Sequence, residues 1–502
     1  MMDTLNGMLL GFGTALAPGN LMYAFLGVVL GNVVGVLPGI GPLAAISMLL
    51  PITFSIEPAA ALMMLAGIYY GAQYGGATTS IMLNLPGVAS HAVTCLDGHP
   101  MAKKGRAGAA LLLAMLASFF GATIGILIMM FFSPIISETA LKFGPAEYFS
   151  MMVLGLLAAT TLSQGSAVKG VVMVVLGIVL GVVGTDVNTG TARFTFGIPH
   201  LYDGISLVAL AMGLFGIADV LRSVNRIGKA NVQGKGVGWR NLKLTKEETR
   251  RSIKPMARGT GIGAFFGVLP GTGSTIASFM SYALEKKVSK TPQAFGKGAV
   301  EGVVGPEASN NAAAQTAFIP TMTLGIPGDA VMALMLGAMM IHGITPGPTL
   351  IGEYPEVFWG LIASFWIGNL LLMVLNVPLI GLWVRLLTVP YRFIYPAVLF
   401  FICVGVYSYH NTYFDVALVL LFGMAGFMLM RMGFEPAPLL LGFVLGPMLE
   451  EYLRRALLLS RGDPMVLLQR PLSASFLAIG AALVLWTLWS TYRGSARSKA
   501  AA

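Results

Sequence analysis

The chain has 502 residues; 56% are hydrophobic and only 10% are charged, and the formal net charge is +10. A soluble domain carries about 25% charged residues, so this composition excludes an ordinary soluble protein. No P-loop, no GxSxG nucleophile motif and no metal-ligand spacing of histidines is present, which argues against ATP-driven transport by this chain, acyl transfer and zinc chemistry.

Long apolar stretches follow one another along the chain. The stretches near 107–132, 146–163, 168–185, 203–221 and 472–489 are each about long enough to cross a ~30 Å hydrocarbon core. The sequence therefore predicts an all-α polytopic membrane protein. Its positive charge is concentrated in loops, above all in the eleven Lys and Arg between Arg222 and Arg258, so the positive-inside rule explains it and nucleic-acid binding is not expected.

Two glycine- and proline-rich octets interrupt apolar segments: GVLPGIGP at 35–42 and GVLPGTGS at 267–274, 232 positions later (Gly35 to Gly267). Two further pairs keep the same order. NLPG at 84–87 corresponds to GIPG at 325–328, and ASFFGATIGIL from Ala117 corresponds to ASFWIGNLLLM from Ala363. Ordered matches of this kind predict a tandem duplication, which is typical of secondary transporters.

Charge placement predicts that the two repeats are inverted. The second octet is flanked by Arg258 on one side and by Lys286 and Lys287 on the other, whereas the first has no basic flanks. We therefore expect re-entrant hairpins that enter from opposite faces, although Arg454 and Arg455 would then lie outside, against the rule. The expected organisation is a first repeat with an N-terminal helix at 1–221, a basic cytoplasmic connector at 222–258, a second repeat at 259–460, and a C-terminal helix with a cytoplasmic tail at 461–502.

The broken segments predict where the site lies. Non-helical backbone at membrane depth is tolerated only inside protein or against a wet cavity. Helix N-termini exposed at a break suit anions, and free carbonyls suit a small hard cation. We expect the cation near Gly39, Gly41, Pro86, Gly271, Gly273 and Pro327. The alternative is that these residues only kink the helices or let them pack closely.

Small hydroxyls and amides cluster beside the breaks and can bind a carboxylate without a buried permanent charge. The predicted substrate ligands are Thr78, Thr79, Ser80, Asn84, Ser274, Thr275, Asn310, Asn311, Thr321 and Thr323. Hydroxyls that bond to their own helix are the alternative for each. Glu307 is either a functional carboxylate or a helix cap, and Asp97 is expected in an exposed loop beside Lys103 and Lys104.

The motifs GVLPGIGPLAAISMLLPITF, YYGAQYGGATTSIMLNLPG, LDGHPMAKKGRAGAAL and GVLPGTGSTIASF resemble the large membrane subunit of the tripartite tricarboxylate transporters. The resemblance runs from about residue 20 to 460. It implies a bacterial inner-membrane, multi-pass permease of about twelve membrane segments, related in architecture to elevator-type carriers. It also implies two partners, a small four-helix membrane subunit and a periplasmic solute-binding protein.

The resulting hypothesis is a permease subunit that imports citrate or a related carboxylate with a coupling cation, Na⁺ rather than H⁺, and needs no organic cofactor. A membrane enzyme acting on a lipid-linked substrate and a channel-like protein are the alternatives. The first would need clustered catalytic acids, bases or metal ligands, which the sequence lacks. Duplicated broken helices favour alternating access over an open pore.

Overall fold

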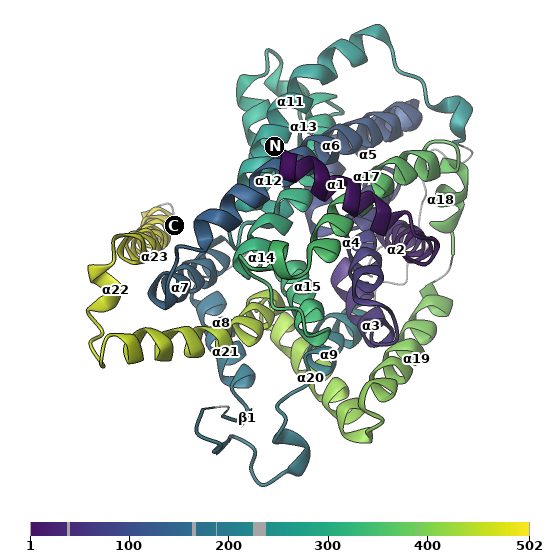
Figure 1. Cartoon of the computed structure of the whole chain (residues 1–502). Coiled ribbons are helices and arrows are strands. Elements are labelled where there is room, and N and C mark those ends of the chain that lie inside the picture. Colours follow the sequence, from purple (N-terminus) through teal and green to yellow (C-terminus); the bar gives the residue numbers. More distant parts are fainter. Residues whose placement is uncertain are drawn as a thin grey trace.

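A computed structural model of the chain describes residues 2–37, 41–162, 167–186, 188–223, 237–389 and 391–500. Most of this is helix, and the sheet found in these ranges is one short antiparallel pair (Figure 1). Within these ranges, four helical segments are long and apolar enough to cross a membrane: Pro18–Val36, Ala89–Ala140, Pro355–Asn376 and Tyr413–Arg431. The expectation of an all-α membrane protein is confirmed at this level.

The elements up to residue 223 are α1 (Met2–Ala15), α2 (Pro18–Val36), α3 (Pro42–Thr53), α4 (Pro58–Leu83), η1 (Ala89–His91), α5 (Ala92–Met101), the π-helical η2 (Ala102–Arg106), α6 (Ala107–Ala140), α7 (Pro145–Leu162), α8 (Ala167–Gly181), β1 (Gly184–Thr185), β2 (Ala192–Arg193), η3 (Pro199–Leu201), α9 (Leu207–Ala211), the π-helical η4 (Met212–Ile217) and α10 (Ala218–Ser223). These helices follow the apolar stretches closely. Both octets interrupt helices, as predicted.

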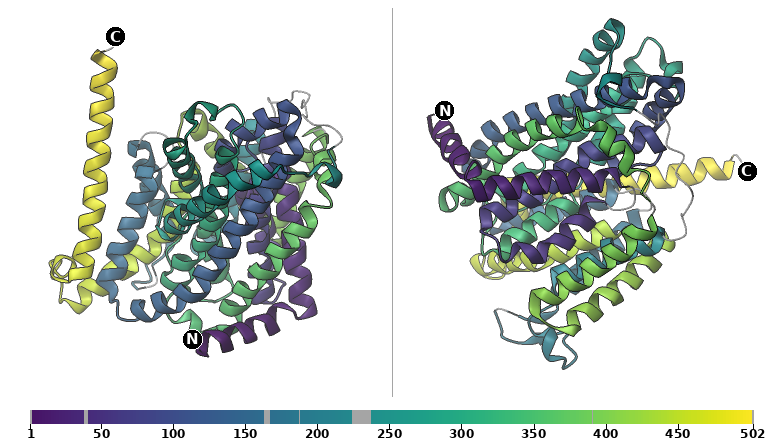
Figure 2. Two further views of the ribbon diagram at one scale, coloured as in Figure 1. Left: turned by 90° about the horizontal axis from the view of Figure 1, so that it is seen from above. Right: turned by 90° about the vertical axis from the view of Figure 1, so that its right-hand side faces the viewer.

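The elements after residue 236 are η6 (Trp239–Asn241), α11 (Lys246–Val268), α12 (Gly273–Val288), η7 (Pro292–Ala294), α13 (Glu301–Thr316), α14 (Phe318–Leu324), α15 (Ala330–Ile341), α16 (Leu350–Glu353), α17 (Pro355–Asn376), α18 (Ile380–Leu386), α19 (Tyr391–His410), α20 (Tyr413–Arg431), α21 (Pro436–Leu459), α22 (Val466–Gln469) and α23 (Pro471–Ala500). Helix α11 begins with a capping box, in which Thr245 and Glu248 exchange bonds with each other's backbone amides. Helix α23 packs on α7 at the edge of the molecule, and its end extends beyond the other helices (Figure 2).

Two helix pairs are held together by glycines at four-residue spacing. On α2, the glycines that touch backbone atoms of α4 are Gly27, Gly31 and Gly35, opposite Met64, Ile68 and Ala72. On α11, those that touch backbone atoms of α13 are Gly259, Gly263 and Gly267, opposite Gly305, Ser309 and Ala313. Small residues at this spacing let helix backbones approach closely. The glycines of these two seams are 232 positions apart, the same offset that separates the octets.

Helices from the two halves of the chain pack on each other. Helix α6 packs on α13, with Gly121 and Gly125 against the backbone of Ala308 and Ala312. Helix α17 packs on α4, with Gly368 against the Tyr70 ring. The largest buried side chains also lie at this contact: Tyr70, Phe318 and Phe365 form edge-to-face pairs between α4, α14 and α17. The core therefore sits between the two halves, around α4 and α13.

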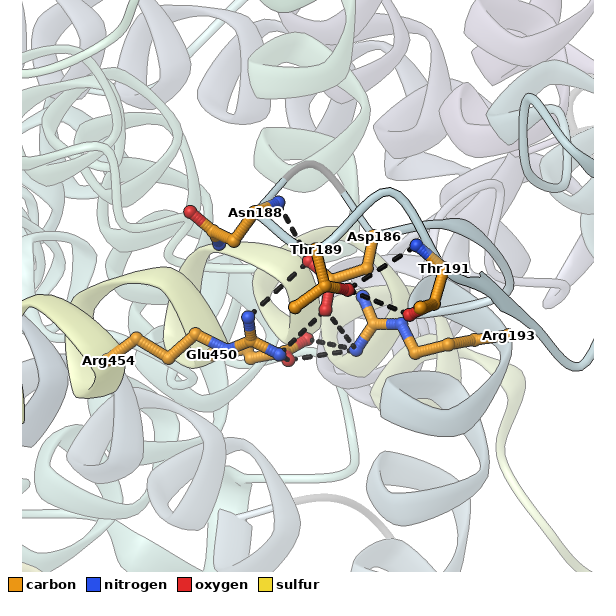
Figure 3. A network of polar contacts seen from close by, with 7 residues as sticks. All are labelled: Asp186, Asn188, Thr189, Thr191, Arg193, Glu450 and Arg454. Atoms are coloured by element: carbon orange, nitrogen blue, oxygen red, sulfur yellow. Dashed lines mark hydrogen bonds and ion pairs between the residues drawn. The ribbon is translucent and has the colours of Figure 1, made fainter.

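The hairpin of β1 and β2 is tied to the end of α21 by charged side chains (Figure 3). Gly184 pairs with Arg193, and Thr185 pairs with Ala192. The Arg454 guanidinium donates to Asp186 Oδ2 at 2.8 Å, and Arg193 donates to both carboxylate oxygens of Glu450 at 2.8 and 2.9 Å. A hydrogen bond from the Asn188 amide, and then the Arg454 guanidinium, lower the pKa of Asp186 to about 2.

We expect this hairpin to stay closed over the whole physiological pH range. A carboxyl whose pKa is lowered on folding stabilises the folded state above its unfolded pKa of about 3.9, and the contribution is lost as pH falls through the folded value near 2. Hydrogen exchange of residues 184–193, corrected for intrinsic rates, should therefore give the same protection at pH 5 and pH 7. Asp186→Asn should reduce that protection at both pH values. Asp203→Asn, at an exposed carboxylate in the same connection, is the matched control. Loss of protection in the unmodified protein between pH 7 and pH 5 would contradict this assignment.

Candidate functional site

Each octet packs against the other break in its own half, which is NLPG at 84–87 in the first half and GIPG at 325–328 in the second. In the first half, Gly87 packs on the Gly35 carbonyl oxygen and on Gly76. In the second half, the Gly271 N–H donates to the Gly328 carbonyl oxygen at 2.9 Å. The residues that end α4 and α14, Asn84 and Gly325, both adopt the left-handed conformation, with φ of 59° and 68°. The breaks therefore come together in pairs, one pair in each half.

A set of polar side chains connects the two pairs of breaks. The Tyr69 hydroxyl on α4 donates to Asp329 Oδ2 at 3.1 Å, and Asp329 caps α15 by accepting from the Met332 amide at 2.9 Å. Ser274, in the second octet, and Gln73, one turn along α4, lie beside the same Tyr69 hydroxyl.

The set also includes residues of η1 and α13. The Ser90 hydroxyl donates to Gln73 Oε1 at 3.2 Å, and the Asn310 amide lies 3.1 Å from Nε2 of His91. We call these residues the central polar site: Tyr69, Gln73, Ser90, His91, Ser274, Asn310 and Asp329. They come from α4, η1, α12, α13 and the turn before α15, so five separate segments meet there.

Several atoms of the central polar site are buried without a hydrogen-bond partner. They are Gln73 Nε2, His91 Nδ1 and Asn310 Oδ1. Leaving a buried polar atom unpaired costs about 1–3 kcal/mol. Gln73 and His91 are fully buried, and Asn310 is 1% exposed. Such atoms mark a place where a polar ligand can gain hydrogen bonds without breaking existing ones.

The predicted substrate ligands fall into three groups. Ser274 and Asn310 belong to the central polar site, and Asn311 lies next to Asn310 on α13 and is also buried. The hydroxyls of Thr79, Ser80, Thr321 and Thr323 donate to helix carbonyls: Thr79 to Val36 of α2 at 2.6 Å, and the others to residues of α4 or α13–α14 four positions earlier. Thr78 is buried on α4, Thr275 is half-buried on α12, and Asn84 is exposed at the end of α4.

The predicted cation ligands are also dispersed. Gly271 and Gly273 lie at the second break, where Gly273 faces the Asp329 side chain. Gly41 caps α3, Pro327 is buried, and Pro86 is exposed. Gly39 lies outside the described residues. The placement of the cation at these carbonyls stays a prediction.

The structure corrects two interpretations of acidic residues. Asp97 is not an exposed loop residue: it is fully buried on α5, and its carboxylate accepts from the Tyr282 hydroxyl at 2.9 Å and from the amides of Gly298 and Ala299 at 2.7 Å. Glu307 does not cap a helix. It lies inside α13, 0% exposed, with its carboxylate bonded to Thr94 and Ser118 of neighbouring helices.

Sequence reasoning missed Tyr69, Gln73, Ser90 and His91. The available signal was the polar run YYGAQYGG between predicted breaks and a lone histidine four positions after NLPG. The metal-ligand spacing of the five histidines does not detect a single imidazole in a site for a polar ligand.

Comparison with known proteins identifies the family. The sequence profile of the tripartite tricarboxylate transporter TctA family matches residues 21–441. The chain is 54% identical over 493 residues to an uncharacterised 52.8 kDa protein in the TAR-I ttuC′ 3′ region of Agrobacterium vitis, covering 98% of both chains.

A second protein of Agrobacterium vitis, an uncharacterised protein in the TAR-II ttuC′ 3′ region, is 57% identical over 231 residues. That match covers 46% of this chain and 96% of the relative. No solved structure matches this chain. The profile spans most of the helices that build the paired breaks and the central polar site, and the first relative spans nearly all of the sequence. This chain is therefore a multi-pass membrane protein that belongs to the tripartite tricarboxylate transporter TctA family.

Proposed function

We propose that this chain is the permease subunit of a binding-protein-dependent secondary transporter that imports citrate or a related carboxylate together with a cation. Family membership supports a role in transport within a tripartite system. The observation that carries the substrate class is the pair of unpartnered buried nitrogen atoms Gln73 Nε2 and His91 Nδ1. The Gln73 amide is a donor, and His91 Nδ1 is one in the matching tautomer or when the ring is protonated, so both can bind carboxylate oxygens.

The charges of the central polar site support coupling to a cation. Asp329 is its acidic member, and the other side chains are neutral apart from His91 when that ring is protonated. An anionic substrate brought close to Asp329 would be repelled in a low-dielectric interior. A cation bound close to the site when the substrate enters lowers this repulsion. We propose Na⁺ rather than H⁺ for this role.

The architecture that we propose is two inverted repeats with re-entrant hairpins, about twelve membrane segments and elevator-type movement of the site. The matched seams of α2 with α4 and of α11 with α13, and the left-handed ends of α4 and α14, support the repeat. The proposed partners are a small four-helix membrane subunit and a periplasmic solute-binding protein, and the proposed location is the bacterial inner membrane.

Uptake into proteoliposomes tests this function. The chain and its small partner would be reconstituted together, with the binding protein and labelled citrate outside, and Na⁺ and pH gradients imposed separately. We expect saturable uptake that requires inward Na⁺ and the binding protein. Non-saturable flux would indicate a channel, and chemical conversion of the substrate without net uptake would indicate an enzyme. Either result would overturn the proposal.

Asn310→Ala should raise the half-saturating substrate concentration by about 10- to 150-fold, because a hydrogen bond to a charged group is worth about 1.5–3 kcal/mol. Asn376→Ala is the matched control, since Asn376 is equally buried on α17 and its amide donates to Leu372 of its own helix. The readout is substrate-dependent initial uptake, with the unfolding temperature measured on the same samples. If both variants take up substrate as the unmodified chain does, Asn310 is not a substrate ligand.

A further inference from the structure

We propose that Glu307 and the oxygen atoms around it form the binding site for the coupling sodium ion. This inference rests on the proposed cation-coupled transport, and it names the residues that hold the cation. Glu307 is the seventh residue of α13 and is 0% exposed. Its carboxylate accepts from Thr94 Oγ1 on α5 at 2.6 Å and from Ser118 Oγ on α6 at 3.2 Å.

The negative charge of Glu307 has no basic partner of the kind that nearby acids have. Glu285 pairs with Arg258, and Glu301, at the start of the same helix, pairs with Arg251. Among the ion pairs of the described residues, the partner of Glu307 is His91, with Nε2 3.5 Å away. A buried carboxylate without a compensating charge is costly by several kcal/mol. A cation that binds beside it offsets much of this cost.

The atoms around Glu307 suit a hard cation. Two amide oxygens, Asn310 Oδ1 and Asn311 Oδ1, are buried without a partner. They follow Glu307 at three and four positions along α13, so the three side chains share one helix face. Together with the hydroxyls of Thr94 and Ser118 they supply oxygen ligands, which small hard cations prefer.

The charge of the set favours a monovalent ion. The site has one negative charge, on the Glu307 carboxylate, and four neutral oxygen ligands. A monovalent ion balances this charge, whereas a divalent ion would leave an uncompensated positive charge in the protein interior. Among the described residues, no group of three His, Cys, Asp or Glu side chains could hold a metal ion, so a transition-metal site is not expected here. A proton on Glu307 would neutralise the charge but would leave both amide oxygens unpaired.

The site is connected to the central polar site through a shared residue. Asn310 contacts His91 Nε2 through its amide nitrogen, which leaves its oxygen for the ion. His91 follows Ser90, which is bonded to Gln73. Sodium bound at Glu307 would fix the Asn310 amide, and through it the His91 ring, in one orientation. Binding of sodium and of the carboxylate would then reinforce one another, as linkage requires.

Sodium-dependent unfolding of the purified full-length chain tests this proposal without substrate or partners. NaCl would be titrated against choline chloride at constant ionic strength and pH, with KCl as the comparison. A ligand that binds only the folded state raises the unfolding temperature progressively with its concentration. We expect such a rise with Na⁺ and not with K⁺, and a loss of at least about tenfold in sodium affinity for Glu307→Gln.

Glu301→Gln is the matched control, because it removes a carboxylate from the same helix that already has Arg251 as its partner. It should keep the sodium response even if its starting unfolding temperature is lower. Because Glu307→Gln could fail to fold, Ser118→Ala and Thr94→Val provide a second series, read by direct binding of radioactive Na⁺. Each should weaken sodium binding by several-fold.

Three results would overturn the proposal: no sodium-specific stabilisation of the unmodified chain, an unchanged response in Glu307→Gln, or stabilisation that follows pH but not Na⁺, which would assign the site to a proton. Failure of the transport proposal is separable from these. If proteoliposomes take up no carboxylate while the chain still binds Na⁺ through Glu307, the sodium site stands and the proposed function is wrong.

Discussion

Gly271→Ala is expected to lower the unfolding temperature strongly and to abolish uptake, because two separate costs meet at this position. Gly271 has φ of +81°, where an L-residue with a Cβ is disfavoured by roughly 1–2 kcal/mol. A Cβ would also lie 2.3 Å from the Ala159 backbone nitrogen on α7. The second octet would then have to move away from α7, and the bond from the Gly271 amide to Gly328 would be lost or distorted.

Gly296→Ala separates these two costs. Gly296 has φ of +80°, nearly the same as Gly271, but a Cβ there would meet no atom within 4 Å. Gly296→Ala should therefore show only the cost of placing a Cβ at positive φ, which is a small fall in unfolding temperature with normal uptake. The measurement is thermal unfolding of both purified variants and uptake in matched proteoliposomes. Equal falls for the two variants would mean that the octet does not pack tightly against α7 in the working protein.

The positions of the breaks could be predicted from the sequence, because glycine and proline act locally. Pro38 and Pro270 each remove a backbone donor, and the glycines of the same octets cost helix stability, so a continuous helix through either octet is disfavoured. The order of the motifs along the chain does not predict that the two breaks of one half pack on each other, as Gly35 does with Gly87 and Gly271 with Gly328.

The direction of each polar side chain could not be predicted in the same way. Thr321 and Thr323 are small hydroxyl residues beside a break, as Ser274 is. Both nevertheless donate to carbonyls of their own helical segment, at 2.8 and 2.7 Å. Whether a hydroxyl bonds to its own helix or faces a site depends on which neighbour covers it, and that is a property of packing.

Long-range contacts account for the remaining differences. Asp97 was expected to be exposed because lysines follow it in sequence, but its carboxylate binds the amides of Gly298 and Ala299, about 200 positions away. His91 enters the central polar site because the short helix η1 follows the NLPG break directly and brings it to Asn310. No local pattern encodes either partner.

Gly263→Ala should be among the most damaging substitutions in the chain, although it adds only one methyl group. A Cβ at Gly263 would lie 2.1 Å from the Ser309 carbonyl oxygen, well inside van der Waals contact. The clashing atom is helix backbone, so α11 and α13 must separate along their seam, where Gly259 and Gly267 make similar contacts. Overpacking of a core typically costs about 1–3 kcal/mol, and occasionally more.

Gly261→Ala, two positions earlier on the same helix, is the matched control. A Cβ there would meet no atom within 4 Å, and alanine is favoured over glycine inside a helix by about 1 kcal/mol. It should therefore keep or slightly raise the unfolding temperature, whereas Gly263→Ala lowers it. The Gly263 substitution should also weaken sodium binding, because α13 carries Glu307, Asn310 and Asn311 and its displacement separates them from Thr94 and Ser118. Gly263→Ala with unchanged unfolding temperature and sodium affinity would show that α11 does not hold α13 in place.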